Sequence, residues 1–112
     1  MKTIIALALA ASLHVTRGQE AVAAVLIAEA GGEGVRGMQA VLNVIDNRAR
    51  ATRKTRLHVI TRPKQFSCLN RTTLVSLVWR AKQHPYWAEA VRLVSVSSVP
   101  DLTGGALYYH EK

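Results

Sequence analysis

The chain has 112 residues, of which 49% are hydrophobic, so it has room for a single small domain with one modest core. Its formal net charge of +8 favours anionic partners. Cys68 is the only cysteine, which excludes an intrachain disulfide, and the four histidines lack the spacing of a zinc site. We therefore expect neither a disulfide scaffold nor a bound metal.

The first segment predicts a secretory signal peptide. Met1 and Lys2 precede an apolar run over residues 3–15, and a charged start with a short hydrophobic middle is typical of exported proteins. The run is too short to span a bilayer. We place the boundary after Gly18, although a buried N-terminal helix would give the same pattern. The remaining domain, residues 19–112, carries a net charge of +6, and we expect it to be secreted or periplasmic, at the cell envelope.

Two helices are predicted in the first half of this domain. Over residues 19–30, three aliphatic residues and Glu29 recur at the spacing of one helix face. These are Val22, Val25, Leu26 and Glu29. Residues 37–52 carry a second apolar stripe and end in a basic turn, which suits the negative end of the helix dipole. This stripe consists of Met38, Val41, Leu42, Ile45 and Ala49.

The second half predicts a long loop and two further helices. Periodicity fails over residues 53–70, so we expect a loop with at most one helical turn around Val59 and Ile60. A third helix is expected from a Thr72–Thr73 cap to about residue 83, and a fourth after Pro85. Trp79 and Trp87 are assigned to packing. Residues 100–105 are turn material and residues 106–109 a short extended piece, which makes the predicted fold mainly α, α+β at most.

Glu29 is the most informative residue for chemistry. It lies on the apolar face of the first helix, where carboxylates are rare, and a Gly-rich break with Glu33 follows it. Burial beside Val25 and Leu26 would favour the protonated form, which a general acid needs. If the helix continued for one more turn, Glu33 would be its neighbour at i, i+4. A helix-end residue in a buried ion pair, with Arg36 or Arg48, explains the pattern equally well.

A basic region lies in the middle of the chain. Seven cations fall within residues 48–64: Arg48, Arg50, Arg53, Lys54, Arg56, Arg62 and Lys64. Such a region either binds a polyanion or is a solvated face. One hypothesis is therefore a non-enzymatic basic module that binds anionic polymer, cell wall or nucleic acid, although it gives no reason for Glu29 or the Gly31–Gly32 break.

Four motifs together resemble the bacterial cell-wall hydrolases of the spore-cortex-lytic (SleB-like) type. They are AEAGGEG at 28–34, GMQAVLNVIDNRAR at 37–50, VITRPKQFSCLN at 59–70 and DLTGGALYYH at 101–110. The resemblance implies a lysozyme-like, mostly helical domain that acts on peptidoglycan glycan strands without a cofactor, as a lytic transglycosylase or a muramidase. It makes Glu29 the catalytic acid and Glu33 the second glutamate of the site.

The expected mechanism uses one acid. Glycosidic cleavage requires protonation of the leaving sugar oxygen, and two carboxylates on adjacent helical turns lie side by side, so Glu33 is poorly placed to attack from the opposite face of the sugar. Glu29 would therefore protonate the leaving oxygen and then accept the proton of the 6-hydroxyl as a 1,6-anhydro ring closes. The family continues past the tyrosine pair, whereas this chain ends at Lys112, so a C-terminally shortened, catalytically dead wall-binding relative is a further hypothesis.

The remaining site residues follow from the same motifs. The resemblance gives Asn47 and Arg48 a bracing role, with a solvated helix end as the alternative. Gln65, Phe66 and Ser67 are expected to line a sugar groove, although Phe66 fits a loop anchor equally well. Tyr108 and Tyr109 alternate sides if extended, so one of them can contact the glycan. Anionic wall polymer is a further expected partner of residues 48–64; no stable nucleic-acid partner is expected, and the chain is expected to be monomeric.

Overall fold

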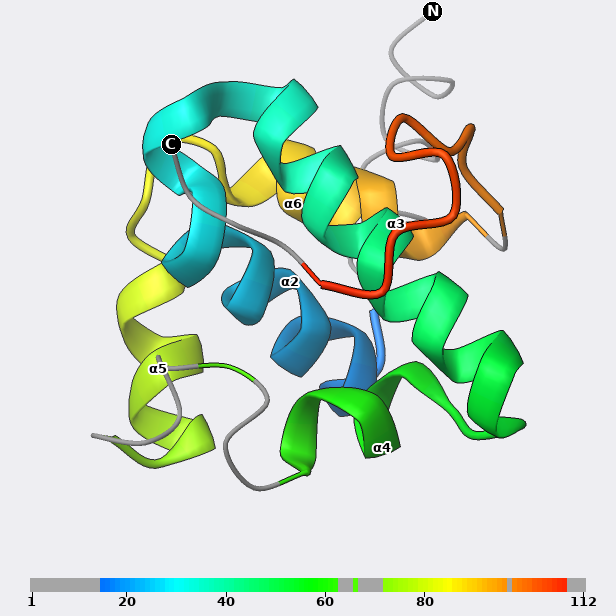
Figure 1. Cartoon of the computed structure of the whole chain (residues 1–112). Helices are drawn as coiled ribbons and strands as arrows, with labels where there is room; N and C mark the ends of the chain where they lie inside the picture. Colours follow the sequence, from blue (N-terminus) through cyan, green and yellow to red (C-terminus); the bar gives the residue numbers. More distant parts are fainter. Residues whose placement is uncertain (1–14, 63–65, 67–71, 97, 109–112) are drawn as a thin grey trace, which may run out of the picture.

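The computed structural model describes residues 15–62, 66, 72–96 and 98–108. Helix α2, Arg17–Ala30, lies at the centre, with α3 and α6 on one side and α4 and α5 on the other (Figure 1). Residues 21–26 are all buried, so α2 is enclosed all round, whereas the sequence predicted one apolar face. Thr16 and Gln19 form a reciprocal capping box, which starts the helix two residues before the predicted position. The expected signal-peptide boundary at Gly18 falls within its first turn.

Helix α3, Gly34–Thr52, follows α2 through a single 3-10 turn, η1, which spans Gly31–Glu33. The predicted stripe is confirmed, because Met38, Val41, Leu42 and Ile45 are each 0% exposed. Arg53 ends the helix in the left-handed conformation, with a φ of 55°.

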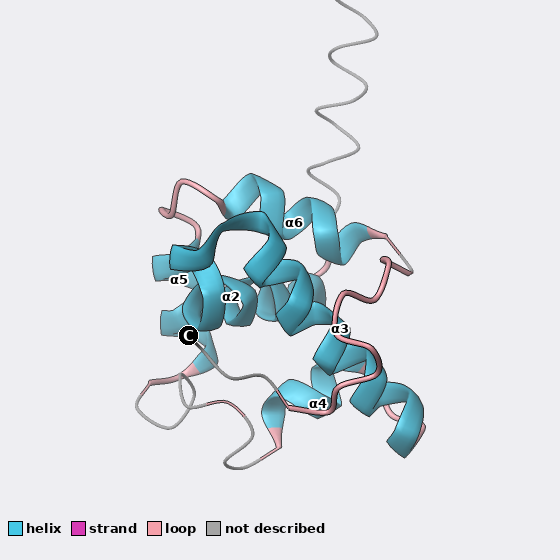
Figure 2. Ribbon diagram, turned by 45° about the horizontal axis from the view of Figure 1, so that its top comes forward, coloured by secondary structure: helices cyan, strands magenta, loops and turns pink. Residues whose placement is uncertain are grey.

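Three shorter helices complete the domain around α2 (Figure 2). Helix α4, Arg56–Thr61, is longer than the single turn expected there. The Thr55 hydroxyl caps its start by accepting from His58 N at 3.1 Å. Helix α5, Leu74–Ala81, is capped by Thr73 as predicted. Helix α6 spans Trp87–Ser95, after Pro85 as predicted, and it buries Ala90, Val91 and Val94.

The two tryptophans differ in their environment. Trp87 packs against the core, as expected. Trp79 is 66% exposed, so its assignment to packing is wrong. Leu77 and Ala81 are the buried residues of α5, and Trp79 is two positions from each, which places it about 200° around the helix from both.

The mainly α fold class is confirmed. Residues 98–108 form turns and irregular backbone, and none of the described residues belongs to a strand. No helix in the described ranges combines the length and the apolar character needed to cross a membrane.

Candidate functional site

The connection between α2 and α3 places the two candidate glutamates. Gly34 has a φ of 79°, a conformation that favours glycine, and it lets α3 start directly after the η1 turn. A Cβ atom on Gly37 would lie 2.6 Å from Glu33 Cβ, so the two chain segments can approach this closely only because Gly37 has no side chain. The α-helical geometry ends at Ala30, and the expected i, i+4 pairing of Glu29 with Glu33 on one helix therefore does not form.

Glu29 lies in the last turn of α2 and is half-buried. Its Oε1 atom is buried and has no hydrogen-bond partner within the described part of the chain. Buried carboxylates are normally paired or hydrogen-bonded, and an exception requires an explanation such as a catalytic role. The ion pairs that the structure describes join Asp46 to Arg56 and Glu20 to Lys82, so the alternative of an ion pair between Glu29 and Arg36 or Arg48 has no support among the described residues.

Glu33 is exposed at the junction between η1 and α3. It is therefore placed on a different element from Glu29 and in a different environment. Glu89, in the first turn of α6, is the other glutamate whose side chain has a buried oxygen, Oε2, without a partner among the described residues. Burial alone therefore does not distinguish Glu29 from Glu89. The feature that distinguishes the two is the Gly-rich turn that follows Glu29.

A row of amides on α3 holds the C-terminal segment, residues 100–108, which we call the strap. Gln39 Nε2 and Asn43 Nδ2 donate to the Pro100 carbonyl at 2.8 and 3.1 Å. Asn43 Oδ1 accepts from the backbone N–H of Leu102 at 2.9 Å, and Asn47 Nδ2 donates to the Ala106 carbonyl at 3.0 Å. Residues 39, 43 and 47 are spaced by four and share one face of the helix.

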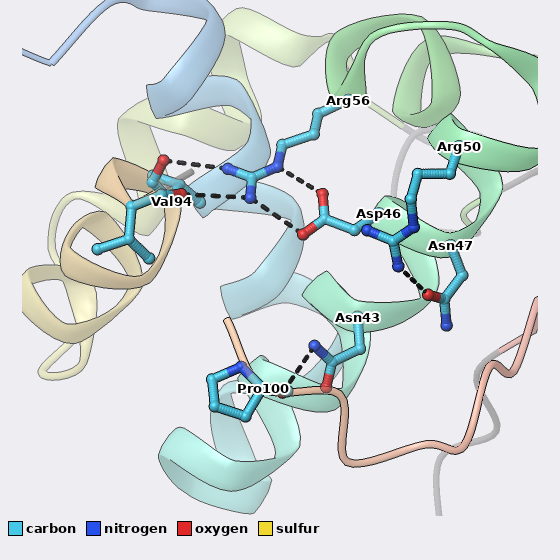
Figure 3. A network of polar contacts seen from close by, with 8 residues as sticks. Asn43, Asp46, Asn47, Arg50, Arg56, Val94 and Pro100 are labelled. Atoms are coloured by element: carbon cyan, nitrogen blue, oxygen red, sulfur yellow. Dashed lines mark hydrogen bonds and ion pairs between the residues drawn. The ribbon is translucent and has the colours of Figure 1, made fainter. Parts of the chain in front are cut away.

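Asn47 therefore lies at a contact between helix and strap, and it is buried, at 8% exposure. Its Oδ1 accepts from the Arg50 guanidinium (Figure 3). The sequence motifs pointed to Asn47 but missed Gln39, Asn43 and Asp101. The repeat of amide side chains every four residues, beside the apolar stripe of the same helix, was the available signal.

Asp101 organises the turn at the start of the strap. Its Oδ1 accepts from Thr103 Oγ1 at 2.6 Å and from Thr103 N at 2.8 Å, and its Oδ2 accepts from Gly105 N at 2.9 Å. The Thr103 hydroxyl above all, then the Thr103 N–H, with smaller contributions from Asn47 and Gly105, lowers the pKa of Asp101 from its ordinary 3.8 to about 2.

The strap carries Tyr108 to the last turns of α3. The Arg48 guanidinium carbon lies 4.9 Å from the centre of the Tyr108 ring, within the range of a cation–π interaction. Tyr108 itself is 68% exposed. Arg48 and Tyr108 also line a pocket of about 180 Å³ together with Arg62 and part of α4.

Of the three consecutive residues expected to line a sugar groove, residues 65–67, the structure describes only Phe66. Phe66 is 6% exposed and belongs to the hydrophobic core, which is the position of a loop anchor and not of a surface that stacks on a sugar. Gln65, Ser67 and Tyr109 lie outside the described residues.

Arg56 fixes the position of α4 relative to α3 and α6. It forms two bonds to Asp46, at 2.6 and 3.0 Å, and donates to the carbonyls of Val94 and Val96 at 3.1 and 3.4 Å (Figure 3). Two cations of the basic region, Arg50 and Arg56, are therefore occupied by internal contacts. The region is not one uniform binding face.

A larger groove, of about 760 Å³, runs between α2 and α5. Its lining includes Ile27 and Ala28 of α2 and Arg80 of α5, with His84 at one end. Glu29 is not among the residues that line this groove or the pocket at Arg48 and Tyr108.

The described residues thus form a small helical domain that combines a buried carboxyl oxygen without a partner among them and, separately, a pocket supported by the strap. Comparison with known protein families supplies the particular family. The model of the family described as Cell Wall Hydrolase matches residues 32–112, which is most of the chain, and the chain belongs to this family. No curated protein and no solved structure matches it. The match begins just before Glu33 and therefore does not include Glu29.

Proposed function

We propose that this chain cleaves the bond between N-acetylmuramic acid and N-acetylglucosamine in peptidoglycan, with Glu29 as acid and then base. The observation that carries the proposal is the buried Oε1 of Glu29, which has no hydrogen-bond partner among the described residues, at the end of the central helix in a member of the cell wall hydrolase family. Glycosidic cleavage needs a positioned general acid that protonates the leaving sugar oxygen, and a glutamate carboxyl group is a common choice.

The proposed reaction is that of a lytic transglycosylase. Glu29 donates its proton to the oxygen of the leaving sugar, and the bond between this oxygen and the anomeric carbon of muramic acid breaks. The Glu29 carboxylate then accepts the proton of the muramic acid 6-hydroxyl, whose oxygen forms the new bond to the anomeric carbon. The proton count of the enzyme is restored and no water is consumed. Attack by water instead would give the muramidase product.

The other carboxylates support a mechanism with one acid. Asp46 is bound by Arg56, Glu20 by Lys82, and Asp101 within the strap. Glu33 follows Glu29 by four residues in the chain, and we assign it a supporting electrostatic role in the site. Glu89 has a buried oxygen without a partner among the described residues, as Glu29 has, so it serves as the control in the test below.

The proposal is tested by comparing Glu29→Gln with Glu89→Gln. Both changes replace a half-buried glutamate that has one partnerless oxygen, so they are matched in chemistry. Release of soluble muropeptides from purified walls should fall by about 10²–10⁴-fold in Glu29→Gln, the usual contribution of a general acid, and remain near the wild-type rate in Glu89→Gln. Circular dichroism should show the same helix content in both. Retained activity in Glu29→Gln would remove the assignment.

A further inference from the structure

The pocket beside the strap has a distinct chemical character. We call it the Arg48–Tyr108 pocket. Its volume is about 180 Å³, and it is lined by Arg48, Ala51, Thr52, Val59, Arg62, Leu107 and Tyr108. Two of these residues are arginines and none is an acid. The lining therefore combines two cations with the apolar residues Ala51, Val59 and Leu107.

The two guanidinium groups have no anionic partner in the described part of the chain. Arg48 contacts the face of the Tyr108 ring, 4.9 Å from its centre. Arg62 is exposed and follows the last residue of α4. The ion pairs that the structure describes use other cations. Two positive groups that line one small pocket repel each other, and an anion bound between them would relieve that repulsion.

The walls of the pocket are held by the contacts described above. Asn47 donates to the Ala106 carbonyl at 3.0 Å, two residues before Tyr108, and so fixes the strap where it reaches Arg48. The Thr52 hydroxyl donates to the Arg48 carbonyl at 2.7 Å. Arg56 anchors α4, which carries Val59 and ends next to Arg62. The pocket therefore has a supported shape, and Asn47 acts on it as a positioning residue.

We propose that the Arg48–Tyr108 pocket binds a carboxylate of the peptide stem that peptidoglycan carries on its muramic acid residues. This rests on the proposed function, because it takes peptidoglycan as the substrate. Guanidinium groups pair with carboxylates through two parallel hydrogen bonds. The apolar lining residues Ala51, Val59 and Leu107 suit the aliphatic side chains of a stem peptide, whereas a phosphate polymer has no apolar group to contact them. The pocket thereby selects peptide-substituted strands.

The experiment measures binding in a Glu29→Gln background, in which the ligand is not cleaved. Fluorescence anisotropy is recorded with a labelled glycan chain that carries peptide stems and with the same chain after the stems have been removed. Arg62→Gln is compared with Lys54→Gln, a matched loss of one exposed positive charge in the same basic region, outside the pocket. We expect Arg62→Gln to weaken binding of the peptide-bearing chain on the order of tenfold, to change binding of the bare glycan less than twofold, and to be partly rescued in Arg62→Lys.

Three results would overturn the proposal. The first is an equal loss of affinity in Lys54→Gln, which would indicate only general attraction between charges. The second is binding of the bare glycan as tight as that of the peptide-bearing chain. The third is an Arg62-dependent affinity for poly(glycerol phosphate) that exceeds the affinity for the peptide-bearing chain, which would make the pocket a phosphate site. Matching thermal unfolding of the variants excludes misfolding as the cause. Failure of the catalytic assignment is seen separately, because Glu29→Gln would then still release muropeptides from purified walls in an assay that does not depend on Arg62 binding data.

Discussion

Asp101 is the side chain on which the conformation of the strap depends most directly. It is exposed, yet its carboxylate accepts bonds from Thr103 and Gly105 and from the amide of Asn47. The sequence places Asp101 in turn material and in a motif of the family resemblance but assigns it no role, because a carboxylate that organises a turn has the same local pattern as one that is merely solvated. The partner Asn47 lies 54 residues away, and only the fold brings the two together.

The lowered pKa of Asp101 predicts how pH acts on the strap. The pKa falls from 3.8 to about 2 on folding, so the charged carboxylate stabilises the folded form. This contribution is complete above about pH 4 and is lost as the pH falls from 4 toward 2. The variant Asp101→Asn should unfold at a lower temperature than the wild type at pH 6. The difference should shrink toward zero at pH 2, as measured by thermal unfolding, and a pH-independent difference would contradict this assignment.

Among the elements, the turn between α2 and α3 places the clearest limits on which residues fit, both in backbone conformation and in space for a side chain. Gly34 supplies the positive φ, and Gly37 lets α3 pass against Glu33 and the Ala30 carbonyl. The Gly-rich break was evident in the sequence as the end of a helix. The direct continuation into α3 was not, because the sequence does not show that a single 3-10 turn is enough to redirect the chain.

Two glycine substitutions separate the close steric contact at Gly37 from the general effect of replacing a glycine by alanine. In Gly37→Ala the new Cβ would lie 2.6 Å from Glu33 Cβ, and we expect a loss of about 1–3 kcal/mol in unfolding free energy despite the higher helix propensity of alanine. Gly32 has no heavy atom within 4 Å of such a Cβ and no positive φ. Gly32→Ala should therefore be neutral or stabilising by up to about 1 kcal/mol. Urea unfolding measures both, and equal effects would argue against the close contact at Gly37.

The helices themselves were largely predictable from local signals. Thr73 marked the start of α5, the apolar stripe of α3 gave its buried face, and the segment after Pro85 gave α6. Helix α4 was underestimated because its stability comes from contacts distant in sequence, chiefly those of Arg56 with Asp46 and with the carbonyls of α6 and the residue after it. Contacts of this kind between distant residues leave no periodic pattern in the sequence.

Considered as a whole, the described part of the molecule is a set of helices packed around one central helix, with Glu29 in the last turn of that helix. The six consecutive buried residues 21–26 of α2 are all apolar. Sequence periodicity could give Glu29 and the helix that carries it. It could not give the strap, the Arg48–Tyr108 pocket or the burial of Phe66, because each of these depends on how distant segments meet.

The packing of the helices gives the cations of residues 48–64 different surroundings. The net charge of +8 suggested a polyanion-binding face over residues 48–64, but Arg50 and Arg56 bind other parts of the chain, whereas Arg48 and Arg62 line a pocket. The described cations of this region therefore differ in their surroundings: Arg50 and Arg56 make internal contacts, Arg48 and Arg62 line a pocket, and Arg53 and Lys54 are exposed.

Mass spectrometry of the fragments released from purified cell walls provides the decisive test of Glu29 as the proton donor. The wild-type chain should release muropeptides with 1,6-anhydro ends, Glu33→Gln should release the same kind of product, and Glu29→Gln should release none above background. If Glu29→Gln gave the wild-type amount of the same products, the acid would have to be another group, and the proposed mechanism would be wrong.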